Sequence, residues 1–179
     1  MSDPKRFEAL VMPHLDAAYN LARWLTRDTH DAEDVVQDAC VRAIKYVASV
    51  DRDGARAWFL TVVRNAFYDW LRRNRPSEIV AGDDESIDNA VDTTSPNPEQ
   101  TAIQLAEARL LSDAVAALPL QYREVLILRE FEDLSYKEIA RVANIPVGTV
   151  MSRLARARGL LQRSPLLHVI GGQALGNAS

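Results

Sequence analysis

Two blocks of arginine are the part of this sequence that could do chemistry, and that chemistry is the binding of nucleic acid. Residues 56–75 carry five arginines against one acid, and residues 142–163 carry four arginines and no acid. Aromatic side chains interleave with the first block, the combination with which proteins stack unpaired bases and follow a single-strand backbone. In the second block, polar residues recur at i, i+3, i+4 and i+7, so they share one helix face that a DNA major groove can admit. These residues are Thr149, Ser152, Arg153 and Arg156.

Each block also has a purely structural interpretation. Most aromatic residues of the first block lie on the apolar stripe of a helix, where such side chains are more often core than stacking platforms. The outward-facing polar candidates are then Asn65, Tyr68, Asp69 and Arg72. The second block could be a solvated surface helix, but Ser135 and Glu138 form a capping box on the helix before it, and Pro146 breaks the chain between the two. Two short helices with a tight break favour a DNA-binding helix-turn-helix.

The acids are segregated from the arginines. The net charge of −4 is unfavourable for DNA binding, but residues 76–108 hold eight acids and no Lys or Arg. An enzyme of the nuclease type needs carboxylates clustered around a metal, or a nucleophile with a base, and the acids here lie mostly in this one segment. We therefore expect no catalytic residues.

Cofactors and membranes are not expected either. Cys40 is the single cysteine, and with three histidines at unsuitable spacing it supplies no common metal site and no internal disulfide. The charged amino terminus lacks the apolar core of a secretory signal, and no run is long enough to span a bilayer. The sequence predicts a cytoplasmic protein with no cofactor, no metal and no membrane insertion.

Helical spacing of apolar residues throughout the chain predicts an all-α fold. Proline, glycine and acidic residues cluster in the middle, where too little apolar surface exists for a core, so we expect a flexible linker between two small helical domains that are held apart. The predicted divisions are a first domain over 4–75, an acidic linker over 76–100, a helix-turn-helix domain over 101–163 and an unassigned tail over 164–179.

The apolar stripes also predict individual helices. One begins near Asp31 as N-cap and turns Val35, Cys40 and Ile44 inward. In the second domain a stripe from Ile103 to Leu118 is expected to face the core, followed by Pro119 at the first position of the next helix.

Three runs of the sequence resemble the extracytoplasmic-function (ECF) sigma factors of bacterial RNA polymerase. They occur in the order and at the spacing of that family and cover most of residues 7–163. The runs are DAEDVVQD (31–38), AWFLTVVRNAFYDWLRR (57–73), and LSYKEIA (134–140) with PVGTVMSRLARAR (146–158).

The resemblance implies a specificity subunit that directs core RNA polymerase to promoters and catalyses nothing itself. It implies a sigma region 2-like first domain that binds the β′ clamp helices and the −10 element, and a region 4-like second domain that reads the −35 element. The loop 50–55 and the helix after it would melt the −10 region and capture a flipped base, near Asn65. The implied partners are core polymerase (β′ and β subunits), promoter DNA and an anti-sigma factor.

The resemblance also assigns residues to each contact. The polymerase-binding candidates are Asp31, Asp34, Val35, Gln37 and Asp38, which without the family would be a solvated acidic face. The −10 candidates are Trp58, Arg64, Asn65, Tyr68, Asp69, Arg72 and Arg73. The −35 candidates are Ser135, Tyr136, Lys137, Val147, Gly148, Thr149, Ser152, Arg153 and Arg156.

Two alternatives stay open at this point. The linker is either a solubilising tether or a chain of carboxylates that occupies a basic channel of polymerase as RNA phosphates do. The chain as a whole could instead be a stand-alone helix-turn-helix regulator that dimerises and binds duplex DNA without polymerase. That alternative offers no reason for the acidic run at 31–38 followed by the aromatic and arginine-rich helix.

Overall fold

The computed structural model describes residues 3–80 and 102–167, and every regular element within these two segments is a helix. The predicted all-α fold is confirmed. The α-helices are α1 (Asp3–Leu10), α2 (Leu15–Thr26), α3 (Thr29–Tyr46), α4 (Ala55–Asn74), α5 (Pro76–Val80), α6 (Ala102–Ala116), α7 (Leu120–Glu130), α8 (Tyr136–Ala143) and α9 (Val147–Gln162). Short 3-10 helices cover Met12–His14, Val47–Ser49 and Arg52–Gly54.

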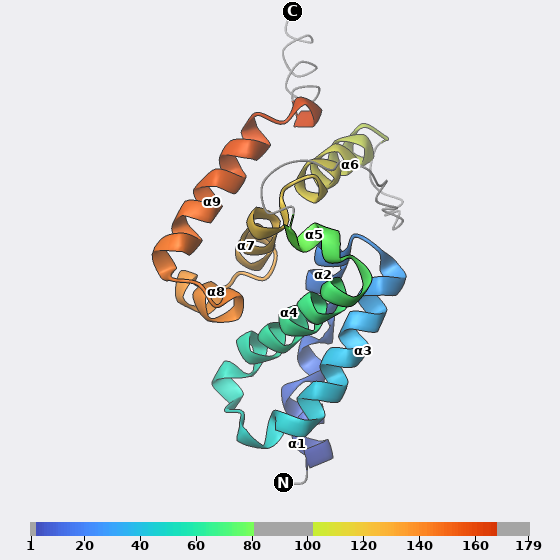
Figure 1. Cartoon of the computed structure of the whole chain (residues 1–179), viewed down its shortest axis with the longest axis vertical. Coiled ribbons are helices and arrows are strands. Elements are labelled where there is room, and N and C mark those ends of the chain that lie inside the picture. The colour runs from blue at the N-terminus through green and yellow to red at the C-terminus, as the bar shows by residue number, and fades with distance from the viewer. Residues whose placement is uncertain (1–2, 81–101, 168–179) are drawn as a thin grey trace, which may run out of the picture.

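The first domain is a bundle in which α2, α3 and α4 pack against one another, with α1 across one end (Figure 1). The stripe predicted for α4 forms its centre: Phe59, Val63 and Phe67 are 1% exposed or less. Leu21 from α2 and Val35 from α3 complete the same core. The structural interpretation of the α4 aromatics is therefore right for Phe59, Phe67 and Trp70, which are buried.

The start of α3 differs from the prediction. The N-cap is Asp28, whose side chain accepts a hydrogen bond of 2.9 Å from the backbone N–H of Asp31. Asp31 is the third helical residue. Both aspartates suit a helix start, and spacing alone did not distinguish the cap from the first turn.

The second domain centres on α7, whose Val125, Ile127 and Leu128 are completely buried. The capping box of Ser135 and Glu138 is present at the start of α8, as predicted. Asn144 ends α8 in the left-handed conformation with φ of 53°, and Pro146 caps α9. The helix-turn-helix predicted from these residues is formed. Pro119, expected as the first residue of α7, is instead its N-cap.

Two stretches of the predicted stripes are not buried. On α6, Ile103 is 68% and Leu111 48% exposed, and only the end of the helix from Ala114 enters the core. On α3, Ile44 is 49% exposed. An apolar stripe becomes core only where another element covers it, and α6 lies at one end of the molecule with its amino-terminal half uncovered (Figure 1).

The two domains are not held apart in this structure. Helix α4 packs against α8, and α2 packs against α7 (Figure 1). Residues 76–80, assigned to the linker, form the short helix α5, and 165–167 of the tail are helical. Residues 81–100 of the linker and 168–179 of the tail lie outside the described residues. Sequence patterns set helices and linkers, but not how far apart the linked domains sit.

Candidate nucleic-acid interface

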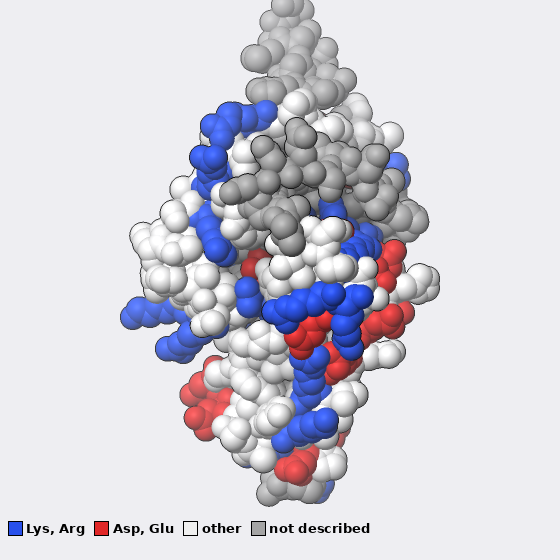
Figure 2. Space-filling view, viewed as in Figure 1, with Lys and Arg blue, Asp and Glu red and all other residues white. Residues whose placement is uncertain are grey.

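The outer face of α9 presents the residues predicted for DNA recognition. Val150 and Leu154 are buried, so the opposite face turns outward, with Ser152 and Arg156 exposed. Thr149 and Arg153 are half-buried. Figure 2 shows Lys and Arg side chains along the outer edge of α8 and α9. The four residues therefore lie on one face of α9, as their spacing predicts.

The amino-terminal turn of α9 is open. Val147 and Gly148 are both exposed. A Cβ added at Gly148 would meet no atom of the chain within 4 Å, so the fold itself does not require glycine here. A helix start with free backbone N–H groups and no side chain in the way can accept a phosphate closely.

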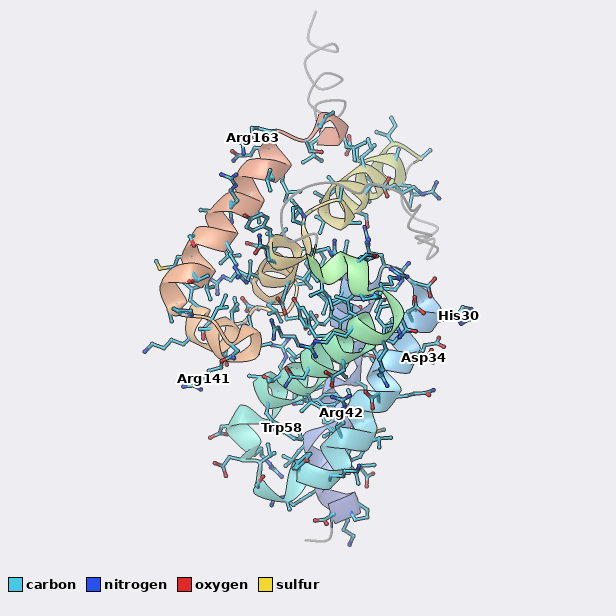
Figure 3. The ribbon with its side chains drawn as sticks, in the orientation of Figure 1. His30, Asp34, Arg42, Trp58, Arg141 and Arg163 are labelled. Carbon is cyan, nitrogen blue, oxygen red and sulfur yellow. The ribbon has the colours of Figure 1, made fainter. Side chains whose placement is uncertain are left out.

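A groove of about 560 Å³ lies between α8 and the start of α9. Lys137 and Arg141 line one side of it, and Asn144 and Val147 lie toward the turn. Figure 3 shows Arg141 projecting from α8. Ser135 is occupied in the capping box, and the guanidinium of Arg129 lies 5.1 Å from the ring centre of Tyr136.

The candidates on α4 divide between two surroundings. Asn65, Arg72 and Arg73 face solvent. The Asp69 carboxylate is held between two arginines, Arg42 Nη1 of α3 at 2.6 Å and Arg72 Nη1 at 2.8 Å. Trp58 is half-buried near the start of the helix, as Figure 3 shows. Asn65, Arg72 and Arg73 are therefore accessible to a partner that approaches this solvent-facing side of α4.

Arg64 and Tyr68 face the second domain instead. The guanidinium of Arg64 forms an ion pair with Glu124 of α7, and the Tyr68 hydroxyl donates to Glu124 Oε2 at 3.3 Å. The same guanidinium lies 4.4 Å from the Tyr68 ring centre. Burial raises the pKa of Glu124 against the opposing effect of Arg64, and burial also raises the pKa of Tyr68. In this structure, two −10 candidates are covered by protein.

Further contacts between the domains surround this pair. Arg56 of α4 donates to Glu132, both to its backbone oxygen and, at 2.9 Å, to Oε2. The rings of Trp24 and Phe131 lie 5.4 Å apart between centres. These partners were not among the predicted site residues.

Arg123, 4% exposed, joins the same boundary. Its guanidinium donates to Ala116 O at 3.0 Å and Leu118 O at 2.8 Å, and to Leu25 O of α2 at 3.4 Å. Burial lowers its pKa to about 10. The group remains charged at neutral pH and binds the carbonyl ends of two helices, one from each domain.

The polymerase-binding candidates on α3 also lie in different surroundings. Asp34 and Gln37 are exposed, and Figure 3 shows Asp34 on the side of the bundle away from α8 and α9. Asp31 pairs with Arg75 Nη2 at 3.1 Å and Asp38 with Arg42 Nη2 at 2.7 Å. Val35 is 1% exposed and belongs to the core, as its place on the predicted apolar stripe indicates, so in this structure its side chain is not open to a partner.

The exposed α3 surface continues into two apolar side chains. Val41 and Ile44 are 55% and 49% exposed. They follow Asp34 and Gln37 at spacings of three to four residues, so the four lie on one face of the helix. Two exposed apolar side chains in line with polar ones make this face of α3 a candidate binding surface.

The comparisons with known proteins match this architecture. The sigma-70 region 2 family matches residues 10–76, and the sigma-70 region 4 family matches residues 108–161. The ECF RNA polymerase sigma factor SigM of Bacillus subtilis is 32% identical over 158 residues, which cover 87% of this chain and 92% of SigM. The chain belongs to the ECF sigma factors.

Two further relatives of this sigma factor agree. ECF sigma factor SigE of Mycolicibacterium smegmatis is 31% identical over 87% of the chain, which spans 60% of the length of SigE. The solved structure of the sigma factor RpoE in complex with the anti-sigma factor NepR, from Bartonella quintana, has a TM-score of 0.68 and 26% identity. That match covers 92% of this chain and 98% of RpoE. The stand-alone regulator is not favoured, because region 2 accounts for the first domain.

Metal clusters, membrane-spanning helices and the cysteine were also considered for this sigma factor. Among residues 3–80 and 102–167, no group of three or more His, Cys, Asp or Glu side chains could hold a metal ion. Within the same segments, no helix is both long and apolar enough to cross a membrane. Cys40 is half-buried, and burial raises the pKa of its thiol.

The residues that sequence reasoning missed, Glu124 and Glu132 above all, carried a weak signal. Glu124 lies three and four residues before the buried Ile127 and Leu128, so a helical wheel turns its carboxylate inward. A carboxylate on an inward face calls for a cationic partner. The partner's identity could not be read, because Arg64 is 60 residues away.

Proposed function

We propose that this chain directs core RNA polymerase to specific promoters, binding polymerase and the −10 element with its first domain and the −35 element with its second. The observation that carries the proposal is the pairing of a region 2 match with a region 4 helix-turn-helix whose outer face is polar and basic. Catalysis belongs to the polymerase, and the site of action is the cytoplasm, where polymerase works.

The polymerase-binding surface is the outer face of α3. Asp34 and Gln37 supply the polar contacts and Val41 and Ile44 the apolar ones. Asp31 and Asp38 act mainly by holding α3 to α4 and by orienting Arg42. The partner is the β′ clamp of the polymerase, with further contacts to the β subunit.

The DNA-binding surfaces are α9 with the start of α8, and the open side of α4. Arg153 and Arg156 can reach guanine edges or phosphates, whereas Thr149 and Ser152 can anchor phosphates or bases of either type. On α4, Asn65 and Trp58 are suited to an unpaired base. The small contact areas and the net charge of −4 predict weak binding to promoter DNA without polymerase.

An anti-sigma factor is the proposed regulatory partner. This rests on likeness to RpoE, which was solved with its anti-sigma factor NepR. In the acidic segment 76–100, most of which lies outside the described residues, both the tether and the channel hypothesis remain proposals.

Run-off transcription with purified core polymerase on a promoter library tests the proposal and reads out the promoter sequence. We expect transcripts that depend on the chain and share −10 and −35 motifs. Reversing the charge in Asp34→Lys should reduce transcription and copurification with core. The control is Glu8→Lys, which reverses the charge of another exposed acid, on α1. If core polymerase alone gives the same transcripts, or never copurifies with the chain, the proposal is wrong.

A further inference from the structure

The segment that joins α3 to α4 exposes four consecutive residues, 51–54, to solvent. We call these residues the α3–α4 loop. The loop is fixed at both ends, because Val50 is 7% and Ala55 1% exposed. It leads directly into α4, where Trp58 lies about one helical turn beyond Gly54. The loop therefore stands beside a residue that is suited to an unpaired base.

Arg6 of α1 binds the backbone just before this loop. Its Nη2 donates to Val50 O at 2.6 Å, and its Nε donates to Val47 O at 3.2 Å. Helix α1 lies across the end of the bundle where α3 leads into the loop, and it packs on the 3-10 helix Val47–Ser49 (Figure 1). The forked guanidinium of an arginine can donate to two acceptors at once in a fixed geometry. One half-buried side chain thus holds two carbonyls that lie 41 and 44 residues further along the chain.

The two hydrogen bonds fix the backbone where it changes from helix to extended chain. Val47 is the C-cap of α3 and is helical, with ψ of −23°, whereas Val50 and Asp51 are extended, with ψ of 130° and 146°. The Val50 carbonyl and the Asp51 N–H belong to one planar peptide unit. Because Arg6 holds that carbonyl, it sets the direction in which the loop leaves the bundle. A cation beside the last carbonyls of α3 also complements the helix dipole.

We propose that Arg6 is a positioning residue for promoter opening, which holds the α3–α4 loop in the conformation that receives an unpaired base of the −10 element beside Trp58. The inference rests on the proposed function, because it takes the start of α4 as part of the −10 surface. Arg6 acts through the backbone of Val47 and Val50 and contacts no base itself.

A loop that is ordered before binding captures a base more effectively. An exposed loop that is free to move loses conformational entropy when it closes on a ligand, and this loss weakens binding. Flipping a base out of a duplex is itself costly, so little binding free energy is left over to order the protein as well. Because Arg6 orders the start of the loop during folding, the free energy of base contacts goes to distinguishing one base from another.

The test compares Arg6→Ala with the matched control Lys5→Ala. Both variants remove one cation from α1, and Lys5 is exposed, so the control reports the effect of charge alone. Hydrogen exchange of the backbone amides of 47–55, measured by mass spectrometry on the whole chain, reports the order of the loop without DNA. Run-off transcription with core polymerase measures discrimination, on a promoter that the wild type recognises and in which each base of the −10 and −35 elements is replaced in turn.

We expect Arg6→Ala to exchange the amides of 47–55 about tenfold faster than wild type and to lose about tenfold of the discrimination among −10 bases, the size of a hydrogen bond from a charged donor. Discrimination among −35 bases should stay unchanged, because the second domain reads them. Lys5→Ala should match wild type in every measurement. Arg6→Lys keeps the charge without the fork, so it should lie between wild type and Arg6→Ala in both exchange and −10 discrimination.

Three results overturn the role of Arg6. They are equal loop exchange in Arg6→Ala and Lys5→Ala, a faster-exchanging loop with unaltered −10 discrimination, and equal losses at the −10 and −35 elements, which indicate general destabilisation. If circular dichroism shows that Arg6→Ala does not fold, the same criteria apply to Arg6→Lys. The outcomes also separate the two proposals: a wild type without transcription rejects the sigma function, whereas an active wild type whose −10 discrimination survives Arg6→Ala rejects only the positioning role.

Discussion

Arg64 of α4 and Glu124 of α7, 60 residues apart in the chain, form an ion pair in which the glutamate side chain is 1% and the arginine side chain 17% exposed. Tyr68 shares the carboxylate through its hydroxyl, so an arginine and a tyrosine of the first domain converge on one acid of the second. This relationship makes the arrangement of the domains sensitive to charge, which the following predictions use.

Closing of the two domains should depend on pH. Burial raises the pKa of both Glu124 and Glu132 above the ordinary value of 4.5, so the closed state favours their protonated forms. Below about pH 4.5 both states are protonated and the effect is level. As pH rises from there through the raised pKa values, closing requires proton uptake and the closed state loses stability. Energy transfer between dyes on the two domains should therefore fall with rising pH over that window.

The control for the pH effect is Glu124→Gln with Glu132→Gln, which removes both titrating groups. The charged and titratable groups that face them remain: Arg64, Tyr68 and Arg153 around Glu124, and Arg56 at Glu132. His14, whose pKa burial and Arg56 lower, also remains. An unchanged pH profile in the variant would mean that other groups control closing.

Substitution of Gly148 should separate fold from function. Gly148→Ala meets no atom within 4 Å and raises helix propensity by up to about 1 kcal/mol, so the second domain should be as stable as wild type or slightly more so. Transcription from promoters that depend on the −35 element should fall, because the methyl group stands where a phosphate approaches the backbone. Gly159→Ala, whose Cβ would make only an ordinary contact of 3.7 Å with Arg163, is the comparison. Equal activity of the two variants would exclude a close backbone contact at residue 148.

The capping box should contribute measurably to the second domain. Ser135→Ala removes the acceptor for the Glu138 N–H and should cost about 1 kcal/mol in the free energy of unfolding. Chemical denaturation followed by circular dichroism measures this. Ser152→Ala, which removes only the hydroxyl that donates to Thr149 O on an exposed face, should change stability by less than about 0.5 kcal/mol. The prediction fails if the two losses are equal.

The apolar part of the α3 surface should matter to polymerase binding. Val41→Ser replaces a side chain that is 55% exposed, so folding should tolerate it while affinity for core polymerase falls. Ile103→Ser on α6, a residue 68% exposed, is the control for a general loss of surface hydrophobicity. Copurification of core polymerase with each variant gives the answer, and retention of full binding by Val41→Ser would remove this residue from the surface.

Local features of this protein were determined by the sequence alone. The helical period placed Val150 and Leu154 inside and Ser152 and Arg156 outside, because a helix of known pitch needs only spacing to define its faces. The capping box of Ser135 and Glu138 and the break at Pro146 are likewise short-range chemistry between neighbours in the chain. These features sufficed to predict the helix-turn-helix, and the three sequence runs sufficed for the resemblance to the ECF sigma factors.

Only the tertiary structure decided what covers each face. Ile44 and Ile103 have the same pattern as buried residues but stay exposed because no element packs on them. Val35, on the same predicted stripe as Ile44, does lie in the core, because α2 and α4 pack against its face of α3. Arg64 and Glu124 lie far apart in the chain, and the sequence offers many other acids that could have formed an ion pair with Arg64. Such contacts depend on how the two domains dock, and that geometry leaves no periodic trace in the sequence.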